Sequence, residues 1–173
     1  FTTFASYDLS AFHELNRMLE EERRVSTGFD LVYRLAMIFE DATLYKPRGD
    51  ADKIVSYFEE MGVDELKRAE YSAYTIYYGW IENLDLPEIE RDFNVYASQL
   101  PEVAQEFAAL LQVYGQLARR KGFDVPKEFE VLRDRIRHGV REEELPIVKI
   151  RGIGRDTCRN VYAFASILRT QFG

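Results

Sequence analysis

The chain has 173 residues, of which 46% are hydrophobic and 31% charged, and its net charge is −7. This balance is typical of one folded domain and excludes disordered, collagen-like and low-complexity proteins. No run of about 18 or more apolar residues is present, so we expect no membrane span. The first residues show no basic region followed by an apolar stretch, so we also expect no signal peptide. The single cysteine, Cys158, favours a reducing, cytoplasmic compartment, and a start at Phe1 favours a piece of a longer protein.

Apolar residues recur every three or four positions in the first half of the chain, which is the spacing of one helix face. The apolar run 31–39 predicts a buried helix, although its length also permits a strand. The other expected elements of this half are a first helix with N-caps at Asp8 and Ser10, a loop over 45–50, a helix over 54–61 ended by Gly62, and a helix over 64–80.

The second half shows the same periodicity with clear end signals, and no window alternates with a period of two residues. The expected elements are a short helix over 85–94, a long helix over 98–121 capped by Ser98 and ended by Gly122, a helix over 126–138 ended by Gly139, a helix reaching Ile150, a tight turn, and a helix from Arg155 onward. The sequence therefore predicts an all-α fold: a helical bundle with a C-terminal helix-hairpin-helix element.

Charge is distributed unevenly along the chain. Residues 1–116 hold 10 Lys and Arg against 22 Asp and Glu, a net charge of −12, whereas residues 117–173 hold 13 against 8, a net charge of +5. An acidic surface favours solubility in any case, and the basic end also suits binding of a polyanion.

Aromatic residues gather on the predicted helix 64–80, at Tyr71, Tyr74, Tyr77, Tyr78 and Trp80. Two interpretations stay open. These rings could form a platform on which nucleic-acid bases stack. Alternatively, Tyr77 and Trp80 belong to the core, and the other three pack along a flank against neighbouring helices.

Several kinds of catalytic and metal chemistry lack a signature in this sequence. It has no phosphate-binding loop of the GxxxxGK[ST] type, no HExxH and no nucleophile elbow. His13 and His138 are the only histidines and lie far apart, so with one cysteine they form no zinc set. We therefore expect this chain alone to have no ATPase activity, no metal and no cofactor.

The most informative segment is 145–162, in which an apolar helix end is followed by Gly152, Ile153 and Gly154 and then by another helix. This is the pattern of a helix-hairpin-helix. The glycines would allow positive φ and close approach of a ligand, and the free N–H groups of the following helix would face a phosphate. The predicted contact residues are Lys149, Arg151, Gly152, Ile153, Gly154, Arg155 and Arg159, helped by Arg133 and Arg137. The alternative is an ordinary helical corner with solvated basic residues.

The segment 135–145, Arg-Ile-Arg-His-Gly-Val-Arg-Glu-Glu-Glu-Leu, followed by this hairpin, resembles the C-terminal region of archaeal Ski-type superfamily-two DNA helicases. The resemblance implies a helical ratchet domain at 31–140 and part of a helix-hairpin-helix domain at 141–173, with 1–30 an unassigned N-terminal helix. It also implies a longer parent protein whose two RecA-like domains use ATP and Mg²⁺ to separate DNA strands, for instance during DNA repair.

The sequence departs from that family at two places. The family's ratchet helix contacts DNA bases through an Arg and a Trp, and the aligned positions here are Glu102 and Ala109. Neither can make the same contact. The family also has a glycine after the second hairpin helix, near Ala165, where this chain continues with helix-compatible residues.

Three functions follow from these observations. The first is an accessory region that guides single-stranded or branched DNA and works with the motor domains of the same protein. The second is a docking module that uses its acidic part to bind a partner and does not touch nucleic acid. The third is an RNA-directed relative of the same helicases. Binding to single strands with a salt dependence would separate the first from the second, and a 2′-OH preference would identify the third.

Overall fold

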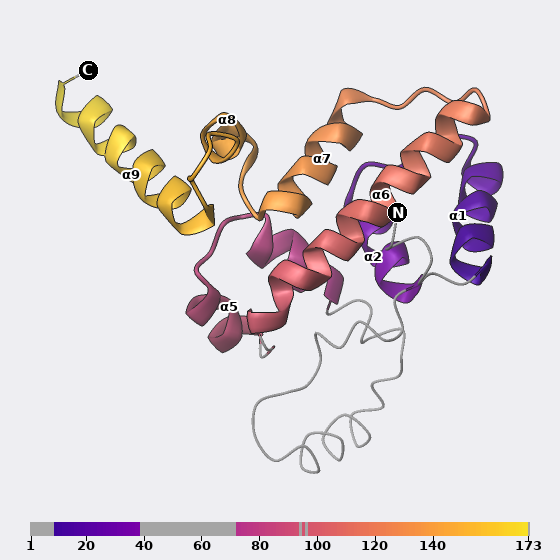
Figure 1. Ribbon diagram of the computed structural model, residues 1–173, viewed down its shortest axis with the longest axis horizontal. Helices are drawn as coiled ribbons and strands as arrows, with labels where there is room; N and C mark the ends of the chain where they lie inside the picture. The colour runs from indigo at the N-terminus through magenta and orange to yellow at the C-terminus, as the bar shows by residue number, and fades with distance from the viewer. Residues whose placement is uncertain (1–8, 39–71, 94, 96, 173) are drawn as a thin grey trace, which may run out of the picture.

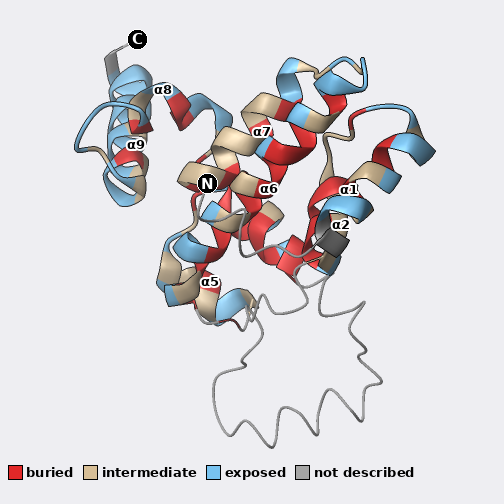
Figure 2. Ribbon diagram, turned by 45° about the vertical axis from the view of Figure 1, so that its right-hand side comes forward, coloured by how far each residue is buried: buried red, intermediate tan, exposed pale blue. Residues whose placement is uncertain are grey.

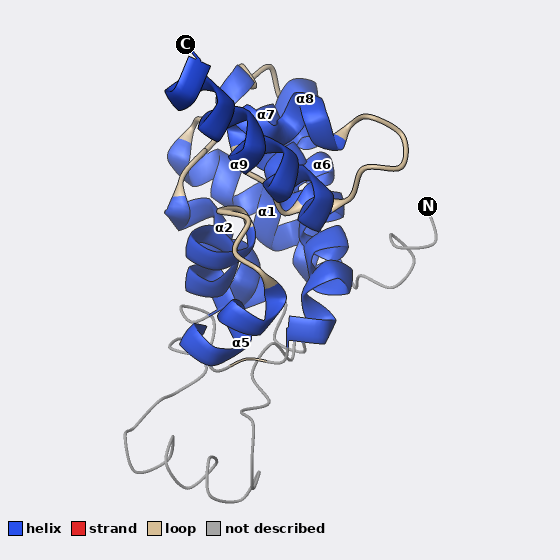
Figure 3. Ribbon diagram, turned by 90° about the vertical axis from the view of Figure 1, so that its left-hand side faces the viewer, coloured by secondary structure: helices blue, strands red, loops and turns tan. Residues whose placement is uncertain are grey.

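The computed structural model describes residues 9–38, 72–93, 95 and 97–172, and this part contains helices and loops but no strand (Figure 3). The elements are α1 (Leu9–Glu22), α2 (Phe29–Ile38), the π-helix η2 (Ile76–Trp80), α5 (Leu86–Phe93), the 3₁₀-helix η3 (Ala97–Gln99), α6 (Leu100–Arg120), α7 (Lys127–His138), the 3₁₀-helix η4 (Glu142–Glu144), α8 (Leu145–Val148) and α9 (Arg155–Phe172). The predicted all-α class is confirmed.

Some predicted features fall outside the described residues. They are Asp8, the loop 45–50, the helix 54–61 with Gly62, the first part of the helix 64–80 including Tyr71, and Asn94. None of the described helices is both long and apolar enough to cross a membrane.

Helix α6 forms the centre of the main core. It packs along α7, and α1 also packs against it (Figure 1). Its inner face is apolar at the predicted spacing and includes Phe107, Leu111 and Tyr114, all fully buried. Gly122 ends the helix with φ of 83°, and Phe123 N–H bonds the Ala118 carbonyl at 2.9 Å, as expected for a left-handed C-terminal glycine.

The chain beyond α7 forms a second, smaller apolar cluster of Val140, Leu145, Val148 and Cys158. We call residues 149–172, the loop and α9 together, the terminal arm. Figures 1 and 2 show α9 projecting from the body of the molecule with most of its surface exposed. Large apolar residues on α9 remain 41–62% exposed, namely Val161, Phe164, Ile167 and Leu168.

Several helix ends and one helix type differ from their prediction. Ser10, expected as an N-cap, is the second residue of α1. Ser98 lies inside η3 and caps nothing; α6 begins at Leu100, with Pro101 in its first turn, where the missing N–H costs no hydrogen bond. The helix expected to reach Ile150 ends at Val148. The helix leading to Trp80 turns from α to π at Ile76, so that Ile81 N–H bonds the Ile76 carbonyl at 3.0 Å. Apolar periodicity does not reveal a single π turn, because the extra residue is taken up within the turn and the spacing on either side of it is nearly unchanged.

Candidate nucleic-acid interface

The turn between α8 and α9 has the open backbone that phosphate binding requires. Gly152 has φ of 86°, as predicted, and a Cβ placed there would meet nothing within 4 Å. The prediction of positive φ at Gly154 is wrong, because the bond from Cys158 N–H to the Gly154 carbonyl at 2.9 Å already begins the turns of α9. Ile153 is half-buried against the small apolar cluster, which holds the turn in place.

Three of the predicted cations remain at the surface of this turn. Lys149 and Arg151 are exposed, and Lys149 Nζ lies 3.3 Å from a carboxylate oxygen of Asp134 on α7. Arg159 is half-buried and pairs with Asp156 on its own helix. Lys149 is therefore the cation of this turn that lies close to α7.

Arg155, by contrast, is turned inward, toward the end of α7 and the η2 turn. Its Nε donates to the Gly139 carbonyl at 2.6 Å, and its Nη2 donates to the carbonyls of Trp80 at 2.8 Å and Gly79 at 3.5 Å. Its guanidinium also lies 4.3 Å from the centre of the Trp80 ring. Burial lowers the pKa of Arg155 to about 10. These contacts hold the Arg155 side chain toward the body of the molecule, because its Nε and Nη2 have backbone acceptors and its plane covers the Trp80 ring.

The two supporting cations on α7 lie on a polar seam between α6 and α7. Arg137 Nη2 donates to Gln112 Oε1 at 3.4 Å, and Gln105 Nε2 donates to the Arg137 carbonyl at 2.9 Å. Arg133 is half-buried, and its Nη2 lies 3.4 Å from the Asp134 carboxylate that also faces Lys149. The seam thus continues from α6 to the loop of the terminal arm.

The positions aligned with the family's base-contacting residues differ in exposure. Glu102 is exposed at the start of α6, and Ala109 is half-buried two turns later. A carboxylate and a methyl group offer no surface for stacking a base.

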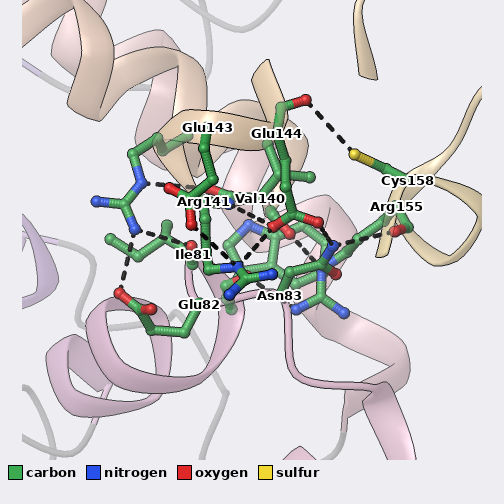
Figure 4. Close-up of polar contacts among 12 residues, drawn as sticks. Ile81, Glu82, Asn83, Val140, Arg141, Glu143, Glu144, Arg155 and Cys158 are labelled. Atoms are coloured by element: carbon green, nitrogen blue, oxygen red, sulfur yellow. Dashed lines mark hydrogen bonds and ion pairs between the residues drawn. The ribbon is translucent and has the colours of Figure 1, made fainter. Parts of the chain in front are cut away.

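A buried polar cluster, which we call the joint, connects the terminal arm to the body (Figure 4). Glu144, whose side chain is fully buried, accepts hydrogen bonds from Asn83 Nδ2 at 2.8 Å and from the backbone N–H and Nε of Arg141, both at 3.0 Å. Asn83 Nδ2 also donates to the Arg155 carbonyl at 3.1 Å. The joint consists of Trp80, Asn83, Gly139, Arg141, Glu144 and Arg155.

The electrostatics of the joint follow from burial and hydrogen bonding. Burial by itself raises the pKa of Glu144, but the hydrogen bonds from Asn83 and Arg141 outweigh it and hold that pKa below its usual value. The thiol of Cys158 donates to the Glu144 carbonyl at 3.4 Å, and burial raises the pKa of that thiol to about 11. At neutral pH Glu144 in the joint is therefore an ionised carboxylate, and the neighbouring Cys158 is a neutral thiol.

From the sequence, Trp80 is predicted among the aromatic residues of one helix and Gly139 at a helix end, but Arg155 is the only residue of the joint singled out as a site residue. The signal was present, because Gly139, Arg141 and Glu144 belong to the segment 135–145 that carries the family resemblance. Gly139 has φ of 67°, and a Cβ there would lie 2.5 Å from the Trp80 ring, so only glycine fits between Trp80 and Arg155. Arg135, from the same segment, donates to the Ile81 carbonyl at 3.0 Å and pairs with Glu82 at 3.1 Å.

The aromatic residues divide between core and surface. Trp80 is buried, and its Nε1 donates to the Ile136 carbonyl at 2.7 Å, while Tyr77 is half-buried. Tyr74 and Tyr78 are 43% and 49% exposed and stack on each other with ring centres 5.3 Å apart. Within the described residues, no group of three or more His, Cys, Asp or Glu is placed to hold a metal ion.

Comparison with known proteins finds no protein-family profile that matches, but it does find curated relatives. The chain is 31% identical over 110 residues to the ATP-dependent DNA helicase Hel308 of Pyrococcus horikoshii, a match that covers 61% of this chain and 15% of the relative. It is 35% identical over 123 residues to Hel308 of Pyrobaculum calidifontis, covering 68% of this chain and 17% of the relative. Hel308 of Pyrococcus abyssi is 28% identical over 85 residues. The chain thus matches a small part of each relative's length, and its predicted relationship to the archaeal Ski-type DNA helicases is confirmed.

Proposed function

We propose that this chain is a nucleic-acid-binding accessory region of an ATP-dependent DNA helicase, in which it guides single-stranded DNA during unwinding. The similarity to the Hel308 proteins, whose names state that activity, is the observation that carries the proposal. Because the match covers 15–17% of those relatives, ATP, Mg²⁺ and the motor domains are proposed for the rest of a longer protein. Such a protein would act inside the cell, where its DNA is.

The surface that best suits this function combines the open turn at Gly152 with the exposed side chains of Lys149 and Arg151. It has the features of a helix-hairpin-helix: accessible backbone, nearby cations and the N-terminus of α9. Arg159, Arg133 and Arg137 extend the positive surface toward α6. Nothing in this set reads base edges, so we expect weak binding without sequence preference, around 10⁻⁴–10⁻⁶ M. Arg155 contributes by holding the turn and not by touching phosphate.

The test is a double charge reversal, Lys149→Glu with Arg151→Glu, measured by fluorescence anisotropy against a labelled single strand at two salt concentrations. Each lost phosphate contact should reduce the slope of log affinity against log salt by about 0.7. Arg91→Glu is the control, because Arg91 is an exposed arginine on another helix, α5, that pairs only with its neighbour Asp92 among the described residues. Unchanged affinity and slope in the double variant would make the turn a structural corner. Competition between DNA and RNA of one sequence tests the nucleic-acid class.

A second candidate function, docking to another protein surface, has its own support in α9. Val161, Phe164, Ile167 and Leu168 leave an apolar stripe on an 18-residue helix that projects into solvent. If docking is the function, the parent chain shows no salt-dependent binding to single strands. Replacing Phe164 and Ile167 by Ser would then weaken association with separately produced motor domains and leave the helix content unchanged.

A further inference from the structure

The terminal arm rests on the body of the molecule over little apolar surface. Its apolar cluster is separate from the main core, and Val131 is the described α7 residue that packs against it. Beyond Tyr162, α9 is exposed at each residue through Gln171. Apolar contact is not directional, so this small cluster does not by itself fix how α9 is oriented. Directional polar contacts must supply the orientation.

Arg155 supplies the most direct of those contacts, at the first residue of α9. Its side chain donates to the carbonyls of Gly139 and Trp80 at 2.6 and 2.8 Å and covers the Trp80 ring, while Asn83 donates back to its carbonyl. A planar guanidinium can bond in two directions and stack at the same time, which an ammonium group cannot do. One side chain therefore links the arm to both the η2 turn and the end of α7.

The joint is also only partly satisfied. Arg155 Nη1 and Asn83 Oδ1 are buried and have no hydrogen-bond partner among the described residues. Burial of the Arg155 guanidinium opposes its charge, as its lowered pKa shows. A buried polar network with unpaired members gains little net stability from closing, because desolvation offsets much of the attraction. Such a contact can fix an orientation and still open more easily than an apolar interface.

We infer that Arg155 is a latch: it holds the terminal arm in one orientation against Trp80 and Gly139, and its release lets the arm move away while α6 and α7 stay packed. The latch places Lys149 and Arg151 relative to the seam between α6 and α7. The latch holds two parts of this chain together whether or not nucleic acid is bound, so it is separate from the proposed function.

The test uses Arg155→Ala and Arg155→Lys, with Trp80 as the reporter, because it is the only tryptophan in the chain. Trp80 is 4% exposed, so opening should shift its emission to longer wavelength. Release of the arm would take Cys158 out of the small apolar cluster, so amides from Cys158 to Tyr162, in the part of α9 that has neighbours, should exchange roughly ten- to a hundredfold faster. Amides of α6 should keep their protection. Arg155→Lys should restore neither the parent emission nor the parent exchange rates, since an ammonium group lacks the paired N–H donors and the flat surface of a guanidinium.

Arg159→Ala is the matched control, because Arg159 lies one turn further along α9 and pairs with Asp156 instead of Trp80. Asn83→Gly is a second route to opening if Arg155→Ala does not fold; φ at Asn83 is 54°, which glycine tolerates. Parent-like emission and exchange in the Arg155 and Asn83 variants would overturn the latch. Equal loss of protection in α6 and α9 would also overturn it, because the arm would then open only when the whole domain unfolds.

Discussion

Helices α6 and α7 meet mainly across apolar side chains, whereas α9 meets the rest of the chain across a small apolar cluster and a network of buried polar groups. In the first interface the Phe129 ring lies 5.7 Å from the Tyr114 ring, and Gly115 sits so close that an added Cβ would be 2.9 Å from Phe129. In the second, Glu144, Asn83 and Arg155 are joined by hydrogen bonds of defined direction. The first interface gains stability in proportion to buried area; the second fixes one geometry and gains less.

The largest expected effect is in the apolar interface. Phe129→Ala removes a ring that is 1% exposed and leaves a cavity beside Tyr114, so we expect about 4 kcal/mol of lost stability. Urea unfolding followed by circular dichroism measures it. The far-ultraviolet circular dichroism signal and the Trp80 emission should change at the same urea concentration, because the whole domain depends on the packing of α6 against α7. A loss under 1 kcal/mol would mean that the α6–α7 interface repacks and that it is not the more stabilising of the two interfaces.

Glu144→Gln should have the next largest effect, and it should be confined to the joint. An amide nitrogen would face the donors of Asn83 or Arg141, so we expect a loss of about 3 kcal/mol in stability. During urea unfolding the Trp80 emission should change at a lower urea concentration than the helical signal. The contribution depends on pH with a definite sign. The folded pKa lies below the ordinary value, so the stabilisation is complete above about pH 4.3 and disappears as pH falls through the folded pKa.

The control for that variant is Glu143→Gln, whose side chain is 46% exposed and lies 3.6 Å from Arg141. It should be close to neutral at every pH. A difference between parent and Glu144→Gln that stays constant from pH 6 to pH 3 would contradict the assignment of an ionised, hydrogen-bonded Glu144.

Gly139→Ala tests how tightly the joint is packed. Besides the cost of φ at 67°, the new Cβ would lie 2.5 Å from the Trp80 ring and 2.7 Å from Arg155 Nε. We expect a loss of about 2 kcal/mol in stability, together with a red shift of Trp80 emission. An unshifted emission would mean that the added methyl group is accommodated without exposing Trp80.

Gly122→Ala is the matched variant with the smallest expected effect. Its φ of 83° is also left-handed, but nothing lies within 4 Å of the added Cβ. Only backbone strain remains, about 1 kcal/mol, with no change in Trp80 emission. Thermal unfolding of the two glycine variants side by side separates strain from crowding. Equal losses would mean that crowding at Gly139 contributes nothing.

The two interfaces also differ in how well the sequence predicts them. The inner face of α6 follows from apolar spacing alone, and Gly122 and Gly139 mark helix ends where predicted. Spacing says nothing about which polar residues meet across 60 or 70 positions of sequence, so Asn83 bonding Glu144 could not be predicted. Arg155 was expected beside a phosphate because composition shows a cation and not the direction in which its side chain turns.

The π-helical turn at Ile76–Trp80 has an evolutionary consequence. A π turn holds one more residue than an α turn, so a helix can absorb a single inserted codon there without disturbing what lies on either side. Removing one exposed residue there, such as Tyr78, should restore regular α winding and leave the segments on either side, with Trp80 beside Arg155, close to their present places. Homologues with a regular α turn at this point should therefore align with this chain across a one-residue gap within 76–80.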